Sequence, residues 1–151
     1  MNILFIEDEI AKAKQVVDYV KSISESINII EKRSYTSGVL EIRSRSYDYL
    51  LLDMSLPLYD IGDYENNYQN EFETFAGLDI LEEIVRVNMK VKVIVITAFD
   101  ILGENDDRIN LEQLDDKMRS EYSEVYLGSI HYNVSSLEWR KQLSTYLTSI
   151  E

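Results

Sequence analysis

The segment Tyr47–Pro57 constrains this chain more than any other part of it. An uninterrupted apolar run, Tyr49–Leu52, stops abruptly at the carboxylate of Asp53, and Pro57, the only proline, follows four residues later. A short run without polar alternation is typical of a strand that is buried on both faces, as in a parallel sheet. Asp53 then lies at the carboxyl end of that strand, where open α/β sheets bind their ligands.

Strand-like and helical patterns alternate along the whole chain. The expected strands are residues 1–6, 27–30, 49–52, 91–96 and 125–130. Stripes at three- and four-residue spacing predict helices that begin near Glu9, near Tyr35 (capped by Ser34 or Thr36), after Thr74, near Leu111, and after Ser135 or Ser136. This alternation predicts an α/β fold, a doubly wound five-stranded parallel sheet in the order 2-1-3-4-5, as a flavodoxin-like three-layer sandwich.

Two stretches interrupt this alternation, and neither marks a domain boundary. Residues 58–75 form an acidic insertion that is rich in aromatic residues and holds no Lys or Arg, and residues 99–110 form a second long polar loop. Connections of this length are usually functional or disordered. We therefore expect a single domain over residues 1–151, with both excursions beside the strand ends that they follow.

Composition excludes several classes of function. With 15 basic against 28 acidic residues, the net charge of −13 disfavours binding to nucleic acid or to anionic membranes. The chain has no cysteine, which excludes disulfides and thiol catalysis. Neither a signal peptide nor an apolar run of membrane-spanning length is recognisable, so we expect a cytoplasmic protein.

Acidic residues follow the first strand as well as the third. Ile3–Ile6 runs directly into Glu7 and Asp8, and the expected fourth strand ends at Thr97. In the order 2-1-3-4-5 these strands are neighbours, so we expect Glu7, Asp8 and Asp53 to converge. Carboxylates in such proximity stay ionised only if a cation joins them, and a hard divalent ion such as Mg²⁺ prefers oxygen ligands. An aspartate at such an ion can act as a nucleophile toward phosphorus.

The sequence resembles the receiver domains of two-component response regulators, of the CheY type. The resemblance rests on four segments in the family's order, which are Ile3–Glu9, Leu51–Pro57, Gly77-Leu78 and Val93–Ala98. It covers essentially the whole chain and implies the CheY-like version of the predicted sandwich.

The resemblance also implies a role for each site residue. Asp53 would be the phosphoacceptor, Asp8 would bind Mg²⁺ directly, and Glu7 would act mainly through water. The backbone carbonyl of Ser55 would complete the protein ligands, and Thr97 would hydrogen-bond the phosphoryl group. Enzymatic activity would be limited to Mg²⁺-dependent autophosphorylation and autodephosphorylation.

One departure from the family concerns the lysine that usually ends the fifth strand and holds a phosphoryl oxygen. No lysine lies there, and His131 or Ser129 is the matching position. With His131 the usual aromatic switch position falls on Gly128, and with Ser129 it falls on Tyr126. A histidine would be only partly cationic at neutral pH.

We therefore expect a stand-alone receiver in a phosphorelay. A histidine kinase or phosphotransfer protein would donate the phosphoryl group, and the modified domain, a monomer or homodimer, would signal by contact with a downstream protein. The alternative is a degenerate pseudo-receiver that is never phosphorylated and acts as an interaction module, a hypothesis motivated by the missing lysine.

Two enzyme classes fit the residues less well. A haloacid-dehalogenase-like phosphohydrolase needs a second aspartate two residues after the nucleophile, where this chain has Ser55. The five glycines are too scattered for a loop that cradles a nucleotide's phosphates. The simplest interpretation of Glu7-Asp8-Glu9 is an acidic first helical turn. Only the presence of Asp53 at the matching end of a neighbouring strand favours a metal site over it.

Overall fold

A single parallel sheet forms the centre of the computed structural model, which describes residues 1–60 and 72–148. Its strands are β1 (Asn2–Ile6), β2 (Asn28–Lys32), β3 (Tyr49–Leu52), β6 (Lys92–Thr97) and β9 (Tyr126–His131). They are ordered β2-β1-β3-β6-β9, and every neighbouring pair is parallel. This order is the predicted 2-1-3-4-5 arrangement, so the doubly wound fold is confirmed.

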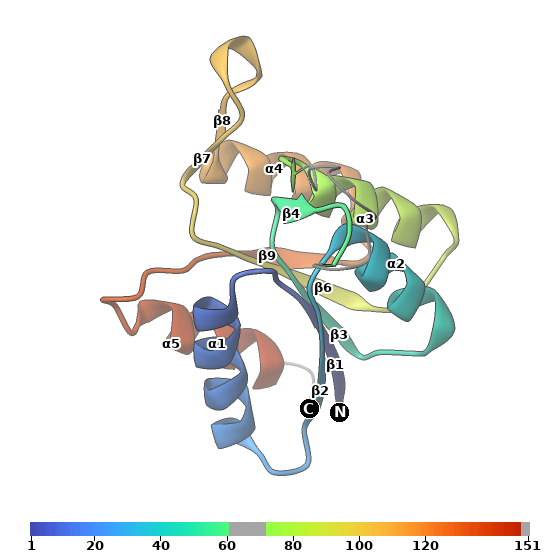
Figure 1. Ribbon diagram of the computed structural model, residues 1–151, viewed down its shortest axis with the longest axis vertical. Helices are drawn as coiled ribbons and strands as arrows, with labels where there is room; N and C mark the ends of the chain where they lie inside the picture. The colour runs from blue at the N-terminus through green and yellow to red at the C-terminus, as the bar shows by residue number, and fades with distance from the viewer. Residues whose placement is uncertain (61–71, 149–151) are drawn as a thin grey trace.

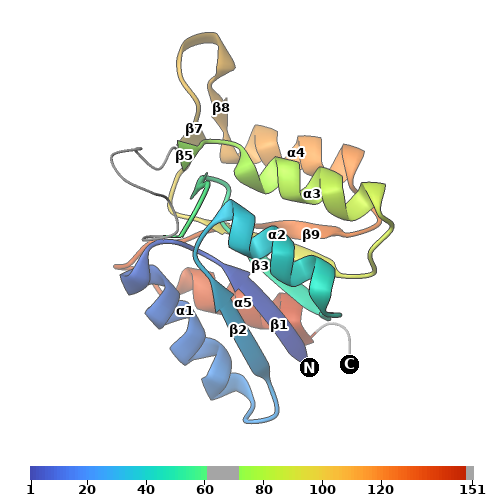
Figure 2. The same cartoon turned by 45° about the vertical axis from the view of Figure 1, so that its right-hand side comes forward.

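Helices cover both faces of this sheet and make three layers (Figure 1). They are α1 (Ile10–Ile23), α2 (Tyr35–Ser44), α3 (Ala76–Arg86), α4 (Leu111–Glu121) and α5 (Glu138–Thr148). Figure 2 shows α2, α3 and α4 side by side on one face, with α1 and α5 on the other. The apolar core is accordingly split in two, because alternate residues of the buried strands point to opposite faces.

The strand register brings the acidic segments to one edge. Ile6 pairs with Leu52, and Leu52 pairs with Val95, so β1, β3 and β6 end at almost the same level. Asp53 continues this contact, because its backbone N–H donates to the carbonyl of Ile6 at 3.2 Å. The first residues beyond β1 and β3, Glu7 and Asp53, therefore emerge side by side.

Helix starts were predicted with mixed success. Of the two predicted caps for α2, Ser34 and Thr36, the structure confirms Ser34, which forms a reciprocal capping box with Ser37. Ser136 Oγ accepts the N–H of Glu138, the first residue of α5, at 3.1 Å. The sequence also suggested Thr74 as the N-cap of the third helix, and this prediction was wrong, because the N-cap residue of α3 is Phe75.

Short antiparallel strand pairs occur at both long excursions. At the base of the acidic insertion, β4 (Leu56–Pro57), which precedes it, pairs with β5 (Phe72–Glu73), and residues 61–71 lie outside the described part of the chain. In the second, β7 (Ile101–Leu102) pairs with β8 (Ile109–Asn110) around the 3-10 turn η1 (Asn105–Asp107), so this expected loop is a hairpin. The hairpin projects away from the sheet, beside the start of α4 (Figure 1).

The part of the chain that the structure describes contains no helix with the length and apolar composition needed to cross a bilayer.

Candidate functional site

Three carboxylates meet where β1 and β3 end. One oxygen from each of Glu7, Asp8 and Asp53 lies within 4.8 Å of the other two. Glu7 and Asp53 are almost fully buried, at 1% and 5% exposure, whereas Asp8 is only half-buried. The convergence that the sequence predicted is therefore present in the fold.

These carboxylates open into a pocket of about 290 Å³. Its lining is Glu7, Asp8, Glu9, Asp53, Ser55, Ala98 and Phe99. Ser55, the expected carbonyl ligand, thus lies in the same pocket as the candidate phosphoacceptor. Short segments that follow β1, β3 and β6 supply every wall, which agrees with ligand binding beyond the carboxyl ends of parallel strands.

Backbone donors fix two of the carboxylates. Asp53 Oδ1 accepts the N–H of Met54 at 2.7 Å, which leaves Oδ2 as the freer oxygen. Glu7 Oε1 accepts the N–H of Glu9 at 3.1 Å, at the start of α1. Each side chain is thereby oriented before any ligand binds.

Burial and mutual repulsion raise two pKa values in this site. Burial raises the pKa of the Glu7 carboxyl above its ordinary value, Lys12 opposes the rise, and the charge of Asp53 adds to it. Burial is also the main cause of the raised pKa of Asp8, to which Asp53 contributes. Both shifts disfavour the ionised carboxylates, and a bound cation would stabilise that ionised form.

The donor set fits a hard divalent ion. The oxygens of opposite ligands around an octahedral Mg²⁺ are about 4 Å apart, close to the spread of the three carboxylate oxygens here. Glu7, Asp8 and Asp53 would hold the ion, with Ser55 at the pocket wall. Such an ion would neutralise charge on a transferring phosphoryl group.

Lys12 is the buried charged residue of this cluster that the sequence analysis missed. Its side chain is only 1% exposed, and Nζ donates to Glu7 Oε2 at 2.7 Å and to the carbonyl of Ile96 at 2.8 Å. Nζ also lies 3.4 Å from Asp53 Oδ2. The sequence contained a signal for its burial, because Lys12 lies four residues before Val16 and therefore on the same inner face of α1.

Residue type explains the omission. The predicted apolar stripe of this helix correctly contained the buried Ala13, Val17 and Val20, but it included Ile10, which is 70% exposed, and left out Lys12 on the same buried face. Lysine is almost never fully buried unless it is paired, so this position reads as solvent-exposed from the sequence.

Thr97 and His131 end neighbouring strands, as expected. Thr97 is fully buried, and its Oγ1 accepts the N–H of Phe99 at 3.2 Å. His131 pairs with Thr97 in register, but its imidazole is exposed and Nε2 lies 3.2 Å from the carbonyl oxygen of Ala98. Among the described residues, no ion pair or hydrogen bond joins His131 to Asp53.

Tyr126 and Ser129 face α4 rather than the acidic pocket. The buried Tyr126 hydroxyl donates to Asp115 and shares a second hydrogen bond with Ser129. Burial and the bond to Asp115 raise the pKa of Tyr126 far above its ordinary value. Tyr126 is therefore held as a neutral donor between β9 and α4.

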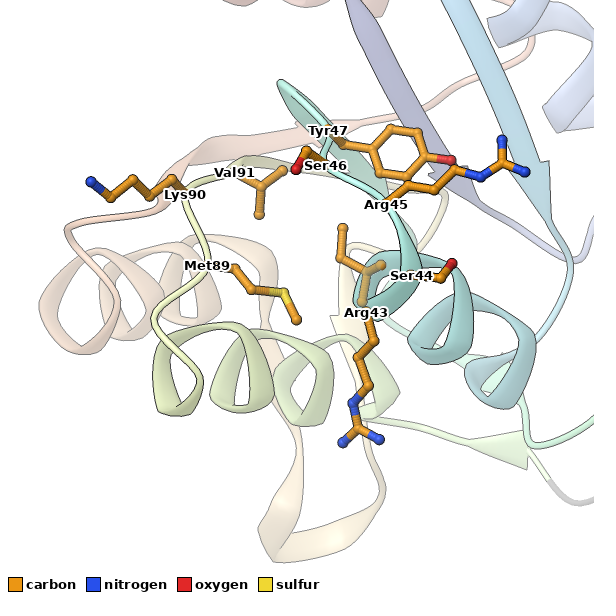
Figure 3. A pocket seen from close by; sticks show the side chains of 9 residues that line it. Arg43, Ser44, Arg45, Ser46, Tyr47, Met89, Lys90 and Val91 are labelled. Carbon is orange, nitrogen blue, oxygen red and sulfur yellow. The ribbon is translucent and has the colours of Figure 1, made fainter.

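A second pocket, of about 340 Å³, lies at the amino-terminal ends of the strands, opposite the acidic cluster (Figure 3). It is formed by residues that precede β3 and β6, including Arg43, Arg45 and Lys90. Figure 3 shows these three side chains extending in different directions. Arg43 pairs with Glu83 and Arg45 pairs with Glu41, so their guanidinium groups do not form an anion site.

Comparison with known proteins agrees with this arrangement. No model of a known protein family matches the sequence. Two curated relatives align over nearly their full lengths. "Uncharacterized protein y4jR" of Sinorhizobium fredii is 27% identical over 151 residues, which is 100% of this chain and 99% of the relative. "Detocs response regulatory protein DtcB" of Enterobacter cloacae is 23% identical, over 99% of this chain and 100% of the relative.

Solved structures show the same fold. A CheY-like response regulator receiver domain from Methylobacillus flagellatus superposes with a TM-score of 0.63 and 17% identity, over 100% of this chain and 98% of that one. TrrA of Thermotoga maritima, solved in complex with Mg²⁺-BeF, superposes with a TM-score of 0.58 and 16% identity, over 95% and 96% of the two chains. The fold of this chain is that of CheY-like receiver domains.

Proposed function

We propose that this protein acts as a receiver that accepts a phosphoryl group on Asp53 and signals by contact with another protein. The observation that carries the proposal is the convergence of Glu7, Asp8 and Asp53 in one pocket at the carboxyl ends of neighbouring strands. The likeness to receiver structures, one of them solved with Mg²⁺-BeF, supports it.

The reaction assigned to this site is a single displacement at phosphorus. An Asp53 carboxylate oxygen attacks the phosphorus of a phosphohistidine on a histidine kinase or phosphotransfer protein. A new P–O bond forms, and the P–N bond breaks with its electron pair leaving on the imidazole, which takes up a proton. Mg²⁺, when bound, supplies positive charge to the phosphoryl oxygens during this transfer.

The protein's own groups orient and shield the nucleophile. The N–H of Met54 holds Asp53 Oδ1, so that Oδ2 is the oxygen left for the attack. Burial of Asp53 keeps bulk water away from the acyl phosphate that forms. We assign Thr97, at the end of β6, to hydrogen-bond the phosphoryl group, and His131 remains a predicted second contact.

A groove between α4, β9 and α5 is the candidate output surface. It has a volume of about 430 Å³, and its lining includes Glu112, Asp115, His131 and Glu138. Three carboxylates and a histidine favour a basic segment of a downstream protein. A phosphoryl group two strands away adds negative charge and can bias the arrangement of this surface.

The test is formation of a phosphoryl adduct. Wild-type protein incubated with Mg²⁺ and a small phosphodonor should gain the mass of one phosphoryl group, and Asp53→Asn should not. Asp60→Asn, which removes a carboxylate beyond β4, is the control and should react like the wild type. No adduct from a small donor or from a kinase would overturn the proposal.

The rival function is an interaction module that is never phosphorylated. The observation in its favour is that residues 126–137, around the end of β9, contain no Lys or Arg. Under this alternative the wild type forms no adduct, but the output groove still binds a partner.

A further inference from the structure

We propose that Lys12, on helix α1, supplies the cation that contacts the phosphoryl group on Asp53. This inference rests on the proposed function, and it assigns a residue on a helix to a task that the sequence comparison placed at the end of β9. Lys12 takes part through charge and hydrogen bonding alone, so it forms no covalent bond and transfers no proton.

The position of Nζ carries the inference. The ammonium group lies 3.4 Å from Asp53 Oδ2, the oxygen that no backbone donor of residues 1–60 and 72–148 engages. A phosphoryl group on Oδ2 places its oxygens two bonds beyond that atom, within reach of a donor that already borders it. Among the described residues, Lys12 is the only lysine or arginine ion-paired with Asp53.

The hydrogen-bond donors of Lys12 also favour a contact with the phosphoryl group. An ammonium group has three N–H donors, and Lys12 uses two of them on Glu7 Oε2 and the carbonyl of Ile96. The distance of 3.4 Å to Asp53 is too long for a good hydrogen bond, so the third donor lacks a close acceptor. A phosphoryl oxygen would provide one, at a site where burial strengthens the interaction.

The surroundings hold Lys12 in this position. Nζ lies 5.8 Å from the centroid of the Tyr132 ring, and this ring packs against Trp139 with centroids 5.2 Å apart. A second cation close to this cluster, Arg33, donates to the backbone carbonyl of Glu7 and to the side chain of Glu31. Among the described residues, no ion pair joins Arg33 to Asp53.

A purely structural role for Lys12, as the counter-ion of Glu7, makes a different prediction. If Lys12 only stabilises the fold of the pocket, its replacement should weaken every ligand of the site. If Lys12 contacts the phosphoryl group, its replacement should weaken a phosphoryl mimic selectively. Mg²⁺ alone should then bind as well or better, because a cation that competes for Glu7 and Asp53 is gone.

The experiment measures the affinities of Mg²⁺ alone and of beryllofluoride at saturating Mg²⁺. Fluorescence of Trp139, the only tryptophan, or calorimetry reports both. Lys12→Met should lower the beryllofluoride affinity at least about tenfold, the effect of a lost hydrogen bond to a charged group, without weakening Mg²⁺. Lys12→Gln, which keeps a donor for Glu7 but no charge, should do the same if the Met variant folds poorly. Lys12→Arg should restore part of the affinity.

Two controls make the result specific. Lys14→Met removes an exposed lysine from the same helix and should leave both affinities within about twofold, because Lys14 pairs with the exposed Asp18 and not with the carboxylates of the pocket. His131→Gln tests the position predicted from the sequence. Loss of beryllofluoride affinity in His131→Gln but not in Lys12→Met would overturn the inference.

The remaining outcomes separate the two proposals. If the wild type and Lys12→Met bind beryllofluoride equally well, Lys12 does not contact the phosphoryl group, but the proposed function stands. If Lys12→Met and Lys12→Gln weaken Mg²⁺ and beryllofluoride to the same extent, the role is structural and the inference fails. If the wild type binds neither ligand, both proposals fall.

Discussion

Gly77 and Met54 show how single residues shape the wall beneath the acidic pocket. Gly77 is the second residue of α3, and its N–H donates to the carbonyl of Met54 at 2.9 Å. A Cβ atom at this position would lie 2.8 Å from Met54 Cε and 3.1 Å from the carbonyl oxygen of Asp53. Glycine is required here because the helix approaches the nucleophile's own backbone.

We expect Gly77→Ala to destabilise the protein by about 1–3 kcal/mol, the usual cost of overpacking a core. Alanine is otherwise the better helix former, so propensity alone predicts the opposite sign. The free energy of unfolding in urea measures the difference. A variant as stable as the wild type would show that Met54 and Asp53 move aside without cost.

Residues differ in how clearly the sequence revealed their roles. Asp53 was predictable because it ends a run of four buried apolar residues, and the partners in β1 followed from the same pattern. Lys12 was not, because its burial depends on the exact phase of α1 and on acceptors that lie 84 residues away, at Ile96. Local patterns do not encode such long-range contacts.

At the scale of elements, strands were predicted better than the segments between them. Buried parallel strands are continuous apolar runs, so each was found within one or two residues. The strand pairs β4–β5 and β7–β8 have only two residues a strand, too short to show alternation. Residues 61–71, which include most of the acidic insertion, lie outside the described part of the chain.

The turn of the β7–β8 hairpin, residues 103–108, should be dispensable for folding, because the core contacts of the hairpin come from Leu102 and Ile109. Its turn uses positive φ angles at Gly103 and Asn105, and the backbone bond from Leu111 N–H to the Asp100 carbonyl closes its base. Replacing residues 103–108 with a two-residue turn should cost less than about 1 kcal/mol, because loop length affects stability only weakly. A much larger loss in urea unfolding would show that the turn itself contributes to the stability of the domain.

Helices α2 and α3 are joined by a charge cluster around Glu83. Glu83 accepts hydrogen bonds from Arg86 on its own helix and from Arg43 on α2. The bond from Arg86, and then that from Arg43, hold the pKa of the Glu83 carboxyl below its ordinary value of 4.5. The ionised form is therefore favoured in the folded state.

The stability that Glu83 contributes to the fold depends on pH. Because the folded pKa of Glu83 is lowered, its contribution to stability is present above pH 4.5 and is lost as the pH falls through the lower folded value. Glu83→Gln should be slightly less stable than the wild type near neutral pH, and the two should converge in acid. A gap that persists when Glu83 is protonated would contradict this account.

The whole molecule carries a net charge of −13, and its candidate site is itself acidic. A field of this sign repels small anionic phosphodonors, and salt screens the repulsion over about 10 Å at moderate ionic strength. At saturating Mg²⁺, adduct formation from an anionic donor should therefore become several-fold faster as salt is raised. A rate that falls with salt would mean that local positive charge, and not the net charge, governs donor approach.

The central claim, that carboxylates from separate strands form one divalent-ion site around Asp53, is tested most directly by calorimetric titration with Mg²⁺. The account predicts a single saturable site in the wild type, at least about tenfold weaker in Asp8→Asn and in Asp53→Asn. Glu112→Gln, in the output groove, should bind like the wild type. No detectable binding, or binding that is unchanged in the Asp8 and Asp53 variants, would contradict it.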